Sequence, residues 1–348
     1  MKTMQAVVKT AAKAGATLLE RKTPEPGPGQ VLVRVLAASI CGTDHHVYAW
    51  DDWAANRVRP PLVMGHECAG EVVELGPGAQ GVKVGDLVSV ETHVSCGLCY
   101  PCRTGQEHLC EQVSILGVDR DGAFADFLAI PAKNAWVNAP GTDPALAAIQ
   151  EPFGNAVHTA LATPLIGRKV AVIGVGPIGL MATAIARQAG AEQVVAVDLS
   201  TYRLQMALKM GADHVVDASR EDTTDALRRL TGGRGVDVVL EMSGSGKALD
   251  QALAACANGA TVALLGLPSA PIRIDMGSRV IMKGITLLGI TGRRMFETWY
   301  RGQALQASGR LDLTPLITHR LPLGEVDQAM GLLERGEAAK IVLFPGGV

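Results

Sequence analysis

Four cysteines stand close together in the chain, at Cys96, Cys99, Cys102 and Cys110. Gaps of two, two and seven residues let neighbouring thiolates fold back onto one metal ion. Four sulfur ligands leave no open position, so the spacing predicts a closed tetrahedral zinc site with a structural role, in a lobe at about residues 93–113. Disulfides and a redox C-x-x-C pair are alternatives, although such spacings in an intracellular enzyme more often bind metal. An iron–sulfur cluster would also accept four thiolates and is a further alternative.

A second group of metal-binding side chains lies upstream. Cys41 opens the segment C-G-T-D-H-H, and His66 and Glu67 belong to G-H-E. One thiolate, one imidazole and one or two carboxylates make an open zinc set that leaves room for a substrate. Zinc in such a site lowers the pKa of a hydroxyl, which alcohol oxidation needs. Glu151 offers a further carboxylate, and Asp44 is placed to hold the imidazole of His66.

Two side chains after Cys41 suit proton transfer. The hydroxyl of Thr43 is two residues from the candidate ligand, so it can reach a substrate oxygen, and His46 can pass the proton to solvent. A hydroxyl that only stabilises a turn is the structural alternative for Thr43. For His45 we favour a solvated loop, and taken singly His66 also fits a histidine of the core.

A glycine-rich turn, G-V-G-P-I-G, contains Gly174, Gly176 and Gly179 and follows the apolar stretch Lys169–Ile173. The first glycine permits a tight turn, the second lets a pyrophosphate approach the backbone, and the third packs helix against strand. Asp198 ends the next apolar stretch, about 20 residues on, as this fingerprint requires. The combination predicts a dinucleotide site, whereas a glycine turn that only packs is the alternative.

The choice between NAD and NADP rests on two residues. The carboxylate of Asp198 can accept hydrogen bonds from the adenosine ribose and would repel a 2′-phosphate. Arg203 lies five residues later and could accept that phosphate. Because Asp198 stands at the strand end, we predict NAD and expect Arg203 to lie along the adenine or ribose.

The pattern of predicted secondary structure changes near the middle of the chain. Up to about residue 160, short strands are broken by Gly and Pro, which predicts a β-rich, barrel-like domain. From residue 169, apolar strands alternate with helices, which predicts a parallel sheet covered on both faces. The early strands are expected at Gln5–Lys9, Val31–Ile40, Gly70–Leu75 and Leu87–Val90. The helices are expected at Leu180–Gln188, Tyr202–Met210, Lys247–Ala257, Met295–Ser308 and Leu323–Arg335, before a final strand in K-I-V-L-F-P.

Composition excludes several classes. The 348 residues are 48% apolar and 19% charged, with a net charge of −2, so no global field favours nucleic acid or anionic membrane. The uncharged stretch Val170–Ala186 has the glycine turn in its middle, which favours strand, turn and helix over a membrane span. The N-terminus shows no signal peptide, and we expect a cytoplasmic protein. Cys68 and Cys256 are expected to be buried thiols.

The motifs G-H-E-C-A-G-E-V-V-E-L-G, C-G-T-D, the four-cysteine lobe and G-V-G-P-I-G resemble those of zinc-dependent medium-chain dehydrogenases. Within that family, H-V-Y-A-W-D-D-W, I-L-G-V-D-R-D-G, E-P-F-G-N-A-V-H-T and G-R-R-M-F-E-T-W-Y resemble the members that act on L-threonine. The resemblance implies an α/β fold with a GroES-like catalytic domain (residues 1–155 and 295–348) and a Rossmann doubly wound domain (156–294). It also implies NAD, two zinc ions per subunit and a homotetramer.

The same resemblance implies roles for individual residues. It places the catalytic zinc on Cys41, His66 and Glu67 with Glu151 nearby, gives Thr43 and His46 a proton relay, and puts His93 beside the substrate. Around NAD it places Gly174, Gly176, Ile178, Gly179, Asp198, Arg203, Leu265, Gly266, Leu267, Ile290 and Thr291.

The expected reaction is oxidation of the 3-hydroxyl of L-threonine to 2-amino-3-oxobutanoate. Arg293 or Arg294 are candidates for the substrate carboxylate and Glu151 for its ammonium group. A polyol or secondary-alcohol dehydrogenase on the same scaffold is the close alternative. A catalytically silent protein that binds NAD or zinc is the alternative from another class.

Overall fold

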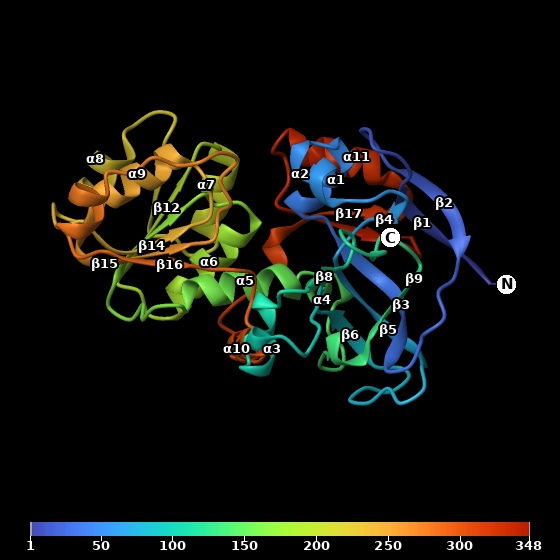
Figure 1. Ribbon diagram of the computed structural model, residues 1–348. Coiled ribbons are helices and arrows are strands. Elements are labelled where there is room, and N and C mark those ends of the chain that lie inside the picture. Colours follow the sequence, from blue (N-terminus) through green and yellow to red (C-terminus); the bar gives the residue numbers. More distant parts are fainter. Residues whose placement is uncertain (1, 348) are drawn as a thin grey trace. The chain divides into compact units, whose positions relative to one another are not determined.

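The computed structural model describes residues 2–347, which cluster into two compact units. The first unit contains the residues up to Pro152 and those from Thr314 onward, and the second unit is Phe153–Leu313 (Figure 1). The chain first passes between them within helix α5 (Gln150–Ala160). Among residues 2–347, no helix combines the length and apolar character that crossing a bilayer requires.

The first unit is built on antiparallel sheets. Its larger sheet has the order β10-β6-β5-β3-β18-β17, with β9 also paired to β3, and β17 and β18 are its parallel neighbours. A smaller sheet has the order β2-β1-β4. These strands are β1 (Thr3–Lys9), β2 (Thr17–Lys22), β3 (Gln30–Ser39), β4 (Leu62–Val63), β5 (Glu67–Leu75), β6 (Leu87–Val90), β9 (Phe127–Pro131), β10 (Ala135–Val137), β17 (Ile317–Pro322) and β18 (Lys340–Phe344).

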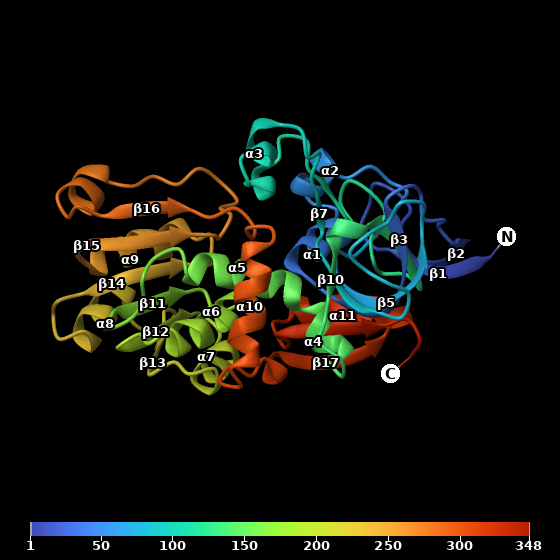
Figure 2. The same cartoon turned by 90° about the horizontal axis from the view of Figure 1, so that it is seen from below.

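Short helices lie between these strands. They are α1 (Gly42–Ala49), α2 (Asp52–Arg57), α3 (Tyr100–Arg103), α4 (Pro144–Ala148) and α11 (Val326–Glu334). The core of the unit is formed by apolar residues of β3, β5 and β6 together with Phe124 and Met330. Around α3 a small lobe extends from this unit (Figure 2). Its two ends are joined where β7 (His93–Val94) pairs with β8 (Ser114–Ile115).

The second unit contains a parallel sheet in the order β13-β12-β11-β14-β15-β16. Its strands are β11 (Lys169–Ile173), β12 (Gln193–Asp198), β13 (His214–Asp217), β14 (Val236–Glu241), β15 (Cys256–Leu264) and β16 (Thr286–Gly289). The helices are α6 (Pro177–Gln188), α7 (Thr201–Lys209), α8 (Thr223–Leu230), α9 (Gly246–Ala255) and α10 (Glu297–Ala307). This strand order is that of a doubly wound dinucleotide-binding fold.

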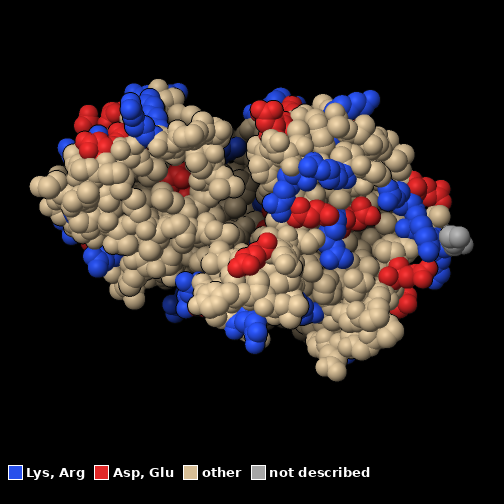
Figure 3. All heavy atoms as spheres, viewed as in Figure 1, with Lys and Arg blue, Asp and Glu red and all other residues tan. Residues whose placement is uncertain are grey.

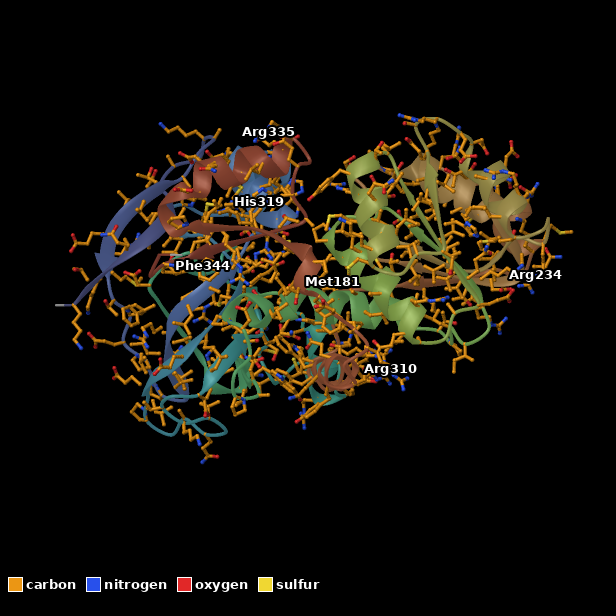
Figure 4. The ribbon with its side chains drawn as sticks, turned by 180° about the vertical axis from the view of Figure 1, so that it is seen from behind. Met181, Arg234, Arg310, His319, Arg335 and Phe344 are labelled. Carbon is orange, nitrogen blue, oxygen red and sulfur yellow. The ribbon has the colours of Figure 1, made fainter. Side chains whose placement is uncertain are left out.

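Both faces of this sheet are buried. On one face Ala171, Ile173 and Val239 pack with residues of α8 and α9. The alternate residues Val170 and Val172 point to the other face and are also fully buried, because side chains alternate along a strand. Helices α6 and α7 pack on β11 and β12, and Met181 of α6, labelled in Figure 4, is fully buried. The predicted α/β architecture is therefore confirmed.

Most predicted elements are present, with two differences. Cys256 and Ala257, expected at the end of a helix, begin β15, where Cys256 pairs with Val236 of β14. Residues 153–155 and 295–313, expected in the catalytic domain, cluster with the second unit. There Gly302 of α10 faces the ring of Phe153, and Gln188 donates to Leu305 O and to Ser308 Oγ.

Charged side chains of both signs are interspersed over the face of the molecule shown in Figure 3. This distribution agrees with the small net charge of −2. It gives that face no broad field of one sign that would attract a polyanion.

Candidate metal centres and dinucleotide site

The four sulfur atoms of the lobe all lie within 4.8 Å of one another. Cys99 Sγ is 3.4 Å from Cys102 Sγ and 3.9 Å from Cys110 Sγ, and Cys96 Sγ is 4.0 Å from Cys102 Sγ. A disulfide needs about 2.05 Å, so all four thiols are free. Four thiolates at about 2.3 Å from one zinc ion would be about 3.8 Å apart, which these spacings match. The lobe therefore fits a closed zinc site.

Backbone N–H groups of the lobe favour the thiolate form of Cys96. Leu98 N and Cys99 N each donate to Cys96 Sγ at 3.4 Å, and these bonds lower the pKa of the Cys96 thiol to about 6. Burial raises the pKa of Cys102 to about 12. Four thiolates side by side repel one another, so a bound cation is what would keep Cys102 ionised next to its neighbours.

A second group consists of Cys41, His66 and Glu67, whose ligand atoms lie within 4.8 Å of one another. Cys41 follows β3 and is the N-cap of α1, and Glu67 is the first residue of β5. Antiparallel pairing of β3 with β5 sets Ser39 opposite Glu67, which brings the two segments together. One thiolate, one imidazole and one carboxylate leave a tetrahedral metal ion one open position, so these residues fit a catalytic zinc.

The turn before His66 depends on Gly65. Its φ is +88°, and a Cβ there would lie 2.2 Å from Cδ1 of the buried Phe124 ring. Only glycine meets both conditions at low cost. This residue therefore fixes the direction in which the chain delivers His66.

Asp44 contacts two members of the metal group, Cys41 and His66. Cys41 N donates to Asp44 Oδ2 at 2.9 Å, and Asp44 Oδ1 is 3.3 Å from His66 Nδ1. Burial alone would lower the pKa of His66, but the charges of Asp44 and Cys41 outweigh it and raise this pKa well above its ordinary value. A carboxylate on one imidazole nitrogen is the usual support for a histidine that ligates metal through the other.

Glu67 is fully buried beside a second carboxylate, Glu151, which is 5% exposed. Burial raises the pKa of Glu67; Lys340 acts in the opposite direction, and Glu151 raises it further. Lys340 Nζ donates to Glu67 Oε2, whereas Glu67 Oε1 accepts no hydrogen bond from the described residues. An unpartnered buried oxygen is costly, and a metal ion would satisfy it.

The residues predicted for proton transfer lie on α1. Thr43 Oγ1 is 3.9 Å from Cys41 Sγ, and His46 is one helical turn further on and exposed. His46 Nδ1 is hydrogen-bonded to Asp51, which also caps α2. His45, expected in a solvated loop, lies on the same helix and pairs with Glu334 at 3.0 Å.

His93, predicted to lie beside the substrate, opens β7 and is half-buried. Its backbone N donates to Glu91 Oε1 at 2.9 Å, and its Nδ1 lies 3.3 Å from the same oxygen. In the second unit Arg293 is fully buried against Gly154, with its Nη1 3.5 Å from Asn155 Oδ1. Arg294 is exposed and pairs with Glu297 at 3.5 Å. Cys68 and Cys256 are buried thiols, as expected.

The three glycines of the turn G-V-G-P-I-G differ in what surrounds them. Gly174 has a φ of +82°, and a Cβ there would lie 2.8 Å from Ser243 Cβ. A Cβ at Gly179 would lie 2.1 Å from Gly174 O. At Gly176, the N-cap of α6, a Cβ would meet no protein atom within 4 Å. Protein packing does not require that glycine, and close approach of a pyrophosphate to the helix N-terminus stays the predicted reason for it.

Asp198 ends β12 and is anchored by three backbone donors. Val175 N donates to Oδ2, and Leu199 N and Ser200 N donate to Oδ1, at 2.8–2.9 Å. A carboxylate has about four acceptor sites, so roughly one remains for a ribose hydroxyl. Arg203, half-buried in the first turn of α7, has an Nε that makes no hydrogen bond among residues 2–347.

The other residues assigned to the dinucleotide lie at the same edge of the sheet, where its parallel strands end. Ile178 is in the first turn of α6, Leu265–Leu267 follow β15, and Ile290 and Thr291 follow β16. Ile290 N donates to Leu264 O at 2.9 Å, which joins the segment after β16 to the end of β15. This edge is where doubly wound sheets bind nucleotides.

Sequence reasoning missed three contributors. The sequence pattern places Lys340 only at the start of an apolar strand, although a charged residue at that point is itself a signal. Asp51 lies five residues after His46 and could have been recognised as a cap that also reaches back to the imidazole. Ser243, which crowds Gly174, gave no signal, since only the pairing of β11 with β14 brings it there.

Comparison with known proteins gives a consistent result. Residues 27–140 match the alcohol dehydrogenase GroES-like domain, and residues 177–307 match the zinc-binding dehydrogenase domain. The L-threonine 3-dehydrogenase of Symbiobacterium thermophilum is 52% identical and covers 99% of this chain and 98% of its own length. The chain belongs to the L-threonine 3-dehydrogenase branch of the zinc-dependent medium-chain dehydrogenases.

Another member of this family, the L-threonine 3-dehydrogenase of Pyrococcus horikoshii, is 48% identical, with 98% of each chain covered. Among solved structures, a zinc-binding dehydrogenase of Sinorhizobium meliloti bound to NADP has a TM-score of 0.92 at 29% identity. It covers 99% of this chain and 100% of that one. The family assignment thus agrees with both the sequence and the fold.

Proposed function

We propose that the protein oxidises the 3-hydroxyl of L-threonine to 2-amino-3-oxobutanoate, with NAD and a zinc ion held by Cys41, His66 and Glu67. The observation that carries this proposal is the convergence of those three side chains within 4.8 Å, in a chain about half identical to L-threonine 3-dehydrogenases over its length. When bound, zinc would polarise the hydroxyl as a Lewis acid and NAD would accept the hydride.

The residues of α1 would move the proton. Thr43 Oγ1 accepts the proton of the substrate hydroxyl while its own proton passes to His46. Asp51 holds Nδ1 of His46, which leaves the other ring nitrogen for this transfer. Because His46 is exposed, it can release the proton to solvent.

Recognition of the amino acid requires partners for both of its charges. We assign the buried Glu151 to the ammonium group, Arg293 or Arg294 to the carboxylate, and His93 to the side of the substrate. Four thiolates of the lobe would hold the second, structural zinc ion. Free thiols throughout the described residues fit a reducing compartment, so we place the protein in the cytoplasm. By its family resemblance, we propose a homotetramer.

A substrate panel tests the activity. NADH formation should be roughly 10⁴-fold faster, as kcat/KM, with L-threonine than with 2-butanol or sorbitol, because buried charges would be left unpaired by a plain alcohol. D-Threonine, which has the same groups in the wrong geometry, is the matched control and should also be poor. Faster turnover of sorbitol or 2-butanol would assign the protein to the polyol or secondary-alcohol class. No NADH with any alcohol in the zinc-loaded protein would favour a silent binding protein.

The cofactor has its own test. Asp198→Ser should raise the ratio of NADP to NAD activity, because it removes the charge that repels a 2′-phosphate while Arg203 stays. The variant also loses the hydrogen bonds that the Asp198 carboxylate accepts from three backbone N–H groups, so its melting temperature should fall. A parent protein that uses NADP as well as NAD would contradict the role given to Asp198.

A further inference from the structure

Lys340 is a buried lysine at the catalytic metal group. It opens β18, is 1% exposed, and lies at the far end of the strand from Phe344, which Figure 4 labels. Its Nζ donates to Glu67 Oε2 and, at 2.8 Å, to Ile40 O. Ile40 precedes Cys41, so one ammonium group contacts Glu67 itself and the residue next to Cys41.

Strand register brings these groups together. Central strand β3 pairs with β5 on one side, where Ser39 is opposite Glu67, and with β18 on the other, where Ser39 is opposite Val342. Ile40 N also donates to Ile341 O at 2.9 Å. The lysine therefore reaches across β3 from a strand near the C-terminus, and its position is set by backbone pairing rather than by a flexible loop.

The charges explain why a cation is needed there. Glu67 and Glu151 are both buried, and neighbouring buried carboxylates repel each other strongly. A buried lysine is itself costly unless it is paired and hydrogen-bonded. Pairing Lys340 with Glu67 offsets both costs. It also occupies Oε2, so Oε1 is the oxygen left for a metal ion.

We propose that Lys340 is a positioning residue of the catalytic metal centre, which holds Glu67 so that one carboxylate oxygen faces the metal. This inference rests on the proposed metal role of Cys41, His66 and Glu67. The competing explanation is that Lys340 only ties β18 to β3 and β5. The two differ in metal affinity, because a tie between strands would stabilise the fold without changing how tightly zinc binds.

The experiment compares Lys340→Met, which removes the charge, with Lys340→Arg, which keeps it. Lys9→Met is the matched control, since Lys9 is another fully buried lysine of the same unit. Within residues 2–347 it donates only to backbone carbonyls, those of Lys13, Gly15 and Tyr48. Zinc per subunit is measured after dialysis against a chelator, and the dissociation constant of the weaker site by chelator competition. Melting temperature is recorded for each variant.

We expect Lys340→Met to weaken the Cys41 site 10–100-fold, the usual effect of losing a group that supports a metal ligand, and to retain about one zinc ion instead of two. Lys340→Arg should recover most of that affinity. Lys9→Met should lower the melting temperature and leave zinc affinity unchanged. If Lys340→Met binds two zinc ions as tightly as the parent, the positioning role is wrong.

Lys340→Met leaves an uncompensated buried charge on Glu67, so it can fail to fold. The double variant Glu67→Gln with Lys340→Met removes both charges and covers that case. If Lys340 acts through Glu67, the double variant should bind zinc no worse than Glu67→Gln alone, whereas additive losses would overturn the inference. A parent protein whose Cys41→Ser variant keeps both zinc ions would instead refute the proposed metal site itself.

Discussion

The two metal groups of the first unit are assembled in opposite ways. The lobe takes its four sulfur atoms from residues 96–110. The other centre takes Cys41 from the segment after β3, His66 from the turn before β5, Glu67 from the first position of β5, and a supporting lysine from β18. A local group closes a short loop at small entropic cost, but a group spread over three strands exists only once the sheet has formed. The lobe should therefore depend on its metal for folding, while the sheet should fold first and then bind metal.

The largest expected effect is on the lobe. Cys99→Ser should abolish its zinc and remove stabilisation on the order of 10 kcal/mol, as for structural zinc sites in small peptides. Calorimetry and zinc analysis should show a lower melting temperature and one zinc ion per subunit. Cys256→Ser, a buried thiol outside both groups, is the control for thiol loss. Unchanged zinc content in Cys99→Ser would disprove the structural site.

The sheet-built centre should show its largest effect in rate rather than stability. Thr43→Val should reduce turnover of L-threonine by roughly 10²–10⁴, the range for a positioned acid–base group, with NAD affinity nearly unchanged. Thr43→Ser keeps the hydroxyl and should retain most of the activity. Near-parental turnover of the valine variant would leave Thr43 as a turn residue, and the contrast between the two centres would weaken.

A substitution in the turn before His66 tests whether the backbone at Gly65 fixes the position of this candidate zinc ligand. Gly65→Ala combines a positive φ with a 2.2 Å clash against Phe124, so it should cost several kcal/mol, about 1–2 of them from the backbone. Gly29→Ala isolates the backbone cost, since Gly29 has a φ of +72° and open space around its Cβ position. Zinc affinity should fall at the Cys41 centre only. Equal effects of the two variants would mean that the ring contact does not matter.

The smallest effect on stability should come from the ion pair that joins the lobe to the rest of the first unit, that of Glu107 with Lys133. Glu107 accepts from Ser95 and from Lys133, and although burial would raise the pKa of Glu107, these two partners outweigh it and lower that pKa. Glu107→Gln should cost about 0.2–1 kcal/mol, as partly exposed ion pairs do, and leave zinc content unchanged. Because the folded pKa is depressed, the cost should be complete at neutral pH and vanish as the pH falls below the ordinary range of glutamate. A loss of zinc in this variant would mean that the lobe is not a self-contained unit.

The two metal groups also differ in how much of each could be predicted from the sequence. The lobe was predicted from spacing, because its ligands are neighbours in the chain. The strand and helix alternation of the second unit was equally clear, and the end of α9 failed only because Cys256 joins a strand pair that propensity does not reveal. At the Cys41 centre the ligand types could be proposed from the sequence. The contact of Lys340 with Glu67 could not, because it depends on the register of β18 against β3, which no local pattern encodes. Asp51 was missed for a related reason, since its role as a cap hides its contact with His46.

The most direct test of this account is the Cys41→Ser variant, examined for zinc content, melting temperature and NADH formation from L-threonine. We predict one remaining zinc ion per subunit, in the lobe, a melting temperature close to that of the parent, and turnover reduced by at least about 10³-fold. A Cys41→Ser protein that retains two zinc ions and oxidises L-threonine at the parental rate would contradict it.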